Sequence, residues 1–126
     1  MMRTLFVSAL VVSIAAQAQA SFEMLMVLDA GTKSVHRFDP VTKAYFGKFA
    51  DDLTDPTSMA IDRSTNTAYI LDSSIYIHAY DYNTGVFKRT WLPGGSFSDI
   101  ELGKNGQLLL TRNLAIEAYD PETQTK

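Results

Sequence analysis

The chain has 126 residues, of which 46% are apolar, 11% aromatic and 20% charged, with no cysteine and a formal net charge of −3. This is the composition of a globular protein, and it excludes low-complexity disorder, a disulfide-stapled miniprotein and a cysteine-based zinc module. A sequence pI near 5.2 also argues against a nucleic-acid-binding surface, which is normally basic.

Residues 1–20 have the pattern of a secretory signal peptide. Arg3 gives a positively charged start, residues 5–16 are apolar apart from two serines, and Ala18-Gln19-Ala20 has the small-residue form of a cleavage site. The apolar run is too short for a membrane anchor, because crossing a bilayer takes about 20 apolar residues. We therefore expect a helical leader, cleavage after Ala20, and a secreted protein, periplasmic or extracellular, without a membrane segment after cleavage.

The rest of the chain, residues 21–126, repeats one pattern three times. The pattern is a β-branched residue, two of any kind, an aromatic residue, Asp, two of any kind, and Thr; it covers residues 35–42, 77–84 and 116–123. Apolar runs precede each copy, at 24–28, 68–71 and 108–110, and further runs at 58–61 and 99–102 precede the second and third. Runs rich in β-branched and aromatic residues, bounded by Asp, Asn, Gly, Pro and Ser, are typical of strands. We therefore expect an all-β protein.

The aspartates of the repeat, Asp39, Asp81 and Asp120, are expected to form turns. An Asp side chain at the start of a hairpin loop accepts hydrogen bonds from backbone N–H groups two residues on, and Pro at the next position fits a type I turn. The fifth residue of each turn is expected to have a positive φ, as in hairpins closed by a G1 bulge. These fifth residues are Lys43, Gly85 and Gln124.

A repeat of about 40 to 45 residues with four strands corresponds to one blade of a β-propeller. In segments such as 55–62 and 68–72 the sequence resembles NHL-like and YVTN-like propeller proteins. The resemblance implies tandem four-stranded antiparallel blades, approximately 22–50, 56–92 and 97–126. With strands lettered A to D from the axis outward, the order is B-C-D, A-B-C-D and A-B-C. The expected fold is an incomplete β-propeller.

The chain is too short to close a propeller by itself. Closure takes about four to eight blades, and residues 21–126 offer about two and a half. Three explanations remain open: the sequence is a piece of a longer protein, several chains assemble one ring through their uncovered end blades, or the blades form an open stack.

The histidines and carboxylates are the candidates for chemistry. His36 and His78 occupy equivalent places in successive copies, and Glu117 stands there in the third. Two His and a Glu could bind zinc, but the repeat alone explains their spacing, so we favour a structural or surface role. In propellers of this kind, ligands usually bind the face formed by the D-to-A and B-to-C loops. The resemblance therefore makes Asp55, Asp72, Asp99 and Arg112 the candidate ligand residues.

These observations favour a secreted, non-enzymatic binding or scaffold protein whose partner is a protein or a small extracellular ligand. The sequence has no G-x-S-x-G elbow, no phosphate-binding glycine loop and no H-E-x-x-H motif, and no cofactor is expected. The alternative is part of a lactonase-like or lyase-like propeller enzyme with an axial divalent metal such as calcium, for which Asp55 and Asp99 are the nearest candidates. A surface protein anchored by a further C-terminal segment is a third possibility.

Overall fold

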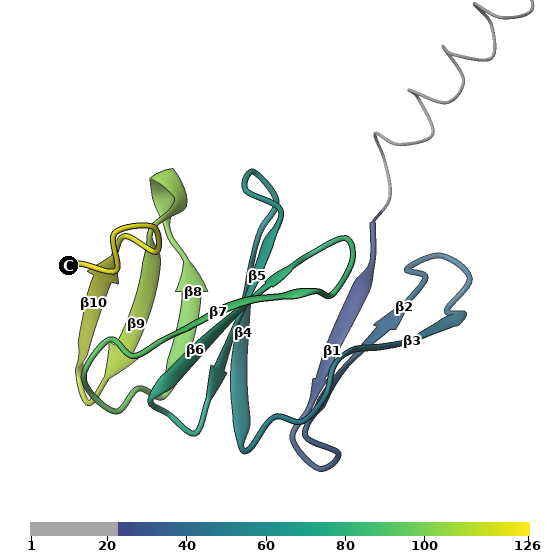
Figure 1. Cartoon of the computed structure of the whole chain (residues 1–126), viewed down its shortest axis with the longest axis horizontal. Helices are drawn as coiled ribbons and strands as arrows, with labels where there is room; N and C mark the ends of the chain where they lie inside the picture. Colours follow the sequence, from purple (N-terminus) through teal and green to yellow (C-terminus); the bar gives the residue numbers. More distant parts are fainter. Residues whose placement is uncertain (1–22) are drawn as a thin grey trace, which may run out of the picture.

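The structure, a computed structural model, describes residues 23–126, and these form three antiparallel sheets (Figure 1). The first sheet holds β1 (Leu25–Asp29), β2 (Ser34–Phe38) and β3 (Tyr45–Ala50). The second holds β4 (Pro56–Asp62), β5 (Thr67–Asp72), β6 (Tyr76–Asp81) and β7 (Phe87–Trp91). The third holds β8 (Asp99–Leu102), β9 (Leu108–Arg112) and β10 (Ala115–Tyr119), with a single 3₁₀ turn, η1 (Lys104–Gly106), between its first two strands.

The three sheets, here called blades 1, 2 and 3, stand side by side and face to face (Figure 1). Strand β4 lies beside both β1 and β8, while β3 and β7 form the outer edges of their sheets. Within residues 23–126, blade 1 therefore lacks its innermost strand, blade 3 lacks its outermost strand, and only blade 2 has all four. This order confirms the expected fold, an incomplete β-propeller.

Two apolar layers hold the blades together. The layer between blades 1 and 2 contains Val35, Phe49, Ala50, Leu53, Ala68, Ile70 and Tyr80. The layer between blades 2 and 3 contains Ala60, Tyr69, Leu71, Ile77, Ala79, Trp91, Phe97, Ile100, Leu108, Leu110 and Tyr119. Because blade 2 is covered on both faces, all six residues of β5 are buried. This explains why its sequence is a continuous apolar run rather than an alternation of apolar and polar residues.

The three repeat aspartates cap hairpin turns in the same way. Asp39 Oδ1 accepts hydrogen bonds from the Val41 and Thr42 N–H groups at 2.7 and 2.9 Å, and Asp81 and Asp120 accept the corresponding pairs. The fifth residues have φ values of 65° at Lys43, 74° at Gly85 and 60° at Gln124, which confirms the expected left-handed conformation. At Gly85 a Cβ would also lie 2.8 Å from the Phe49 carbonyl oxygen, so this turn requires glycine.

The expected leader and its cleavage site at Ala20 lie outside the described residues. Within residues 23–126 no helix has the length and apolar character needed to cross a bilayer.

Candidate functional site

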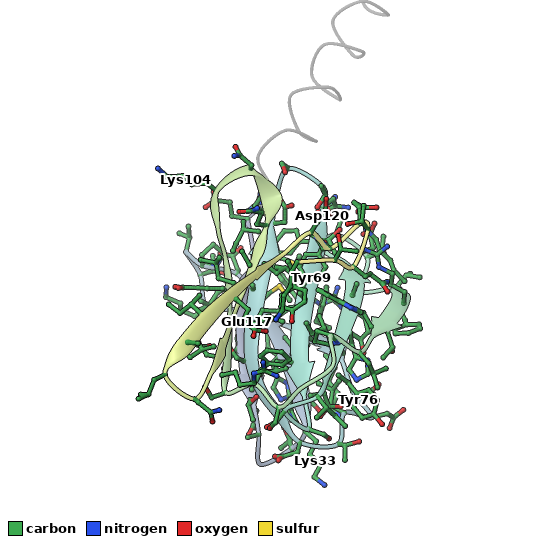
Figure 2. The ribbon with its side chains drawn as sticks, turned by 90° about the vertical axis from the view of Figure 1, so that its left-hand side faces the viewer. Lys33, Tyr69, Tyr76, Lys104, Glu117 and Asp120 are labelled. Carbon is green, nitrogen blue, oxygen red and sulfur yellow. The ribbon has the colours of Figure 1, made fainter. Side chains whose placement is uncertain are left out.

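The sheets present two edges, which carry different loops. The upper edge in Figure 1 has the β4–β5 turn and η1, and the lower edge has the β1–β2 turn and the linkers between blades. Figure 2 shows Lys104 and Asp120 at the upper edge, Lys33 and Tyr76 at the lower edge, and Tyr69 and Glu117 between them. The four candidate ligand residues named from the sequence belong to the lower-edge loops or to the strand ends beside them.

Asp72 is a buried carboxylate at the end of β5. It accepts hydrogen bonds from the N–H groups of Thr54, at 2.9 Å, and Asp55, at 2.5 Å, and its Oδ2 lies 3.2 Å from His78 Nε2. Burial raises the pKa of Asp72, but the two backbone hydrogen bonds and the contact with His78 outweigh it and hold the pKa below its ordinary value. The anionic carboxylate thus ties the linker between blades 1 and 2 to the end of β5.

The repeat position shared by His36, His78 and Glu117 holds a polar pair in each blade. His78 connects Asp72 to Thr90 on β7, where Nδ1 lies 2.8 Å from Oγ1. His36 Nδ1 lies 3.0 Å from the Tyr45 hydroxyl, and its Nε2 lies 3.9 Å from Asp29. These contacts fit the structural role favoured for both histidines.

In blade 3 the acidic residue of the pair stands at the histidine position, and the basic residue stands at the aspartate position. Arg112 stands where blade 2 has Asp72, and its guanidinium lies 2.8 Å from a Glu117 carboxylate oxygen. Lys126 and the Tyr119 hydroxyl also donate to Glu117, and these hydrogen bonds hold the pKa of Glu117 below its ordinary value. The three equivalent residues therefore use partners within their own blades. Within residues 23–126 no group of three or more His, Asp or Glu side chains is arranged to hold a metal ion.

The lower-edge candidates do not converge on one point. The Asp55 N–H group donates a hydrogen bond to the Asp72 carboxylate, but Asp55 itself is exposed. Asp99 accepts a hydrogen bond from Ser58 Oγ at 2.5 Å, which connects β8 to β4. Arg112 lies over the Phe97 ring, 5.7 Å from its centroid, in addition to its pair with Glu117. The structure thus gives these side chains separate partners within the sheets and linkers.

A groove of about 790 Å³ opens at the upper edge, between blades 2 and 3. The groove is lined by the β4–β5 turn, the β8–β9 segment that contains η1, and the last hairpin turn. Its residues are Ile61, Asp62, Arg63, Ser64, Thr65, Tyr69, Leu102, Gly103, Asn105, Gly106, Gln107, Asp120, Pro121 and Glu122. A smaller cavity of about 210 Å³ shares Tyr69 and Glu122 with the groove and also contacts Lys88 and Arg89.

The groove has a nearly buried aromatic residue and an acidic rim. Burial raises the pKa of the Tyr69 hydroxyl, which keeps this residue neutral. Burial also raises the pKa of Asp62, but hydrogen bonds from the Ser64 hydroxyl and from the Ser64 and Thr65 N–H groups outweigh it, so Asp62 is anionic. Three carboxylates and Arg63 give the lining a net charge of −2.

The groove was not among the sites predicted from the sequence. Its three segments, 61–65, 102–107 and 120–122, come from two blades, and the repeat pattern does not show how far the loops of neighbouring blades stand apart. The one available signal was the run of polar and glycine residues at 103–107, which is longer than a tight hairpin turn needs.

The sequence matches no family model and no curated protein. Solved structures do match. Hydrazine synthase of Kuenenia stuttgartiensis aligns with a TM-score of 0.67 and 18% identity, over 80% of this chain and 30% of that one. A Bacteroides fragilis protein described as an inferred exported protein aligns with a TM-score of 0.65 and 16% identity, over 80% and 33%. The β-propeller domain of Swd1 from Myceliophteria thermophila aligns with a TM-score of 0.47 and 11% identity, over 79% and 39%.

The chain spans about a third of the length of the first two of these structures. At such identities the likeness concerns the fold alone, because one fold hosts many unrelated functions.

Proposed function

We propose that the protein is a secreted, non-enzymatic binding module of the NHL-like or YVTN-like propeller kind, and that it binds an extended, basic peptide segment in the groove between blades 2 and 3. The observation that carries this proposal is the groove itself, which is open, polar and acidic at its rim. A net charge of −2 favours a ligand with positive side chains. The lower-edge residues Asp72, Asp99 and Arg112 instead have hydrogen-bonded or ion-paired partners within the protein.

Binding of a basic peptide in the groove is tested by titrating the ¹⁵N-labelled protein with the capped tripeptide acetyl-Lys-Ala-Lys-amide. We expect saturable shifts of amide signals at Ser64, Thr65, Asn105 and Gly106, and no comparable shifts with acetyl-Glu-Ala-Glu-amide. Glu122→Gln should weaken binding about two- to fivefold, as expected for the loss of one exposed ion pair.

Glu101→Gln is the matched control for Glu122→Gln, because Glu101 is also exposed but lies outside the groove. It should leave the affinity for the basic tripeptide unchanged. Amide signal shifts confined to the lower edge, around Thr54, Asp55 and Asp99, would show that the peptide binds there and would contradict the proposal.

Export rests on the pattern of residues 1–20, and the description of the Bacteroides fragilis neighbour as exported is compatible with it. When the full chain is expressed in a bacterial host, we expect the protein in the periplasmic fraction with Ser21 as its first residue. Ala20→Lys should block cleavage, because the site needs small residues. A cytosolic protein that still begins at Met1 would disprove export.

A further inference from the structure

The outer face of blade 1 carries the residue types that blades 2 and 3 bury against the blade before them. Strand register aligns the residues on this face as three sets: Leu25, Val27 and Phe38 in blade 1, Ala68, Ile70 and Tyr80 in blade 2, and Leu108, Leu110 and Tyr119 in blade 3. Val27 is 41% exposed, whereas Ile70 and Leu110 are both 0% exposed. Blade 1 therefore presents a blade-packing face that residues 23–126 leave uncovered.

The outer face of blade 3 carries the residue type that blades 1 and 2 bury against the blade after them. Ile116 occupies the position of Val35 in blade 1 and Ile77 in blade 2, each of which packs on the following blade. Ile116 is 69% exposed, while Val35 and Ile77 are 0% and 1% exposed. One chain thus carries both halves of a blade–blade interface, one at each end of the stack.

We propose that two copies of the chain assemble head to tail, with the outer face of blade 3 in each copy packed on the outer face of blade 1 in the other. The number of sheets is compatible with this assembly. Residues 23–126 form three sheets, one of four strands and two of three, so two copies supply six, within the range of about four to eight blades of a closed propeller. Closing the ring also leaves neither apolar face exposed.

Charge and polar contacts also support the packing of blade 3 of one copy on blade 1 of the other. Residues 23–50 of blade 1 carry a net charge of +1 and residues 97–126 of blade 3 carry −2, so the two end segments have net charges of opposite sign. In blade 2, Asp72 is 3% exposed in its side chain and lies 3.2 Å from His78; the equivalent Asp29 in blade 1 is 42% exposed and lies 3.9 Å from His36. The two histidines are almost equally exposed, at 19% and 18%, so packing a blade on this face would chiefly bury Asp29, as Asp72 is buried in blade 2.

The proposal is tested by analytical ultracentrifugation of the purified protein. We expect a species of twice the chain mass at micromolar concentration. Val27→Glu on the outer face of blade 1 and Ile116→Glu on the outer face of blade 3 should each give a monomer with an unchanged far-ultraviolet circular dichroism spectrum. Val41→Glu is the matched control: Val41 is 85% exposed but lies in a hairpin turn away from both faces, so the dimer should persist.

Mixing the two variants tests the head-to-tail arrangement. In an equal mixture of Val27→Glu and Ile116→Glu, one intact blade 3 face can still meet one intact blade 1 face, so a weaker dimer should return. A wild-type protein that is monomeric at all concentrations would overturn the proposal. A wild-type dimer whose variants fail to restore dimerisation on mixing would overturn the head-to-tail arrangement.

Discussion

Replacing Trp91 with alanine is expected to lower the free energy of unfolding by about 4 kcal/mol, the usual cost of deleting a large buried aromatic side chain. Trp91 is the last residue of β7 and lies in the apolar layer between blades 2 and 3. Its ring meets the Tyr119 ring at a centroid distance of 5.4 Å and an interplanar angle of 69°, so the substitution also removes an edge-to-face aromatic contact.

Urea unfolding followed by far-ultraviolet circular dichroism measures this loss. Fluorescence would not serve, because Trp91 is the only tryptophan of the chain. Trp91→Phe keeps an aromatic ring and should cost about 1 to 2 kcal/mol, which keeps the test informative if the alanine variant does not fold. A loss below about 1 kcal/mol for the alanine variant, the size of a typical surface effect, would show that blades 2 and 3 do not pack as described.

Removing the Asp72 carboxylate should have the second largest effect, a loss of about 3 kcal/mol for Asp72→Ala. The substitution leaves the N–H groups of Thr54 and Asp55 without their acceptor and removes the partner of His78. Asp72→Asn keeps one acceptor oxygen and should lose about half as much. An alanine variant as stable as the wild type would contradict the contacts assigned to Asp72.

The effect of Asp72 should also depend on pH in a defined direction. Because its pKa is lower in the folded protein than in the unfolded chain, its contribution is complete above an unfolded-state pKa of about 4 and is lost as the pH falls through the lower folded-state value. Urea midpoints measured from pH 6 down to pH 2 should therefore fall less steeply for Asp72→Ala than for the wild type. Parallel curves would show that Asp72 is not the source of acid sensitivity.

The arrangement of strands could be predicted from the sequence because its determinants are local and repeated. The Asp–Thr turns recur at fixed offsets, and each turn closes with backbone groups within a few residues of its aspartate. Once the turns are placed, antiparallel pairing and the missing strands of blades 1 and 3 follow from the order of the apolar runs.

The role of single charged residues was much less predictable. Position alone made Asp72 a candidate ligand residue, but its partners Thr54 and Asp55 belong to a linker whose path the repeat does not specify. The groove at the upper edge depends on the distance between loops of different blades, which side-chain packing between the sheets determines. Local pattern thus predicts turns and strands, whereas sites formed between blades require the packed structure.

All strand pairs in the described sheets join neighbours in the sequence. Each blade can therefore form its hydrogen bonds from its own residues, with short loops to close and little chain entropy to overcome. Such a β protein has a lower contact order than one with distant strand pairs, and its folding can begin in any blade and spread to the next. In a single copy, blade 2 is covered on both faces and gains most from its neighbours, so the two end blades are the first parts able to open without unfolding the rest.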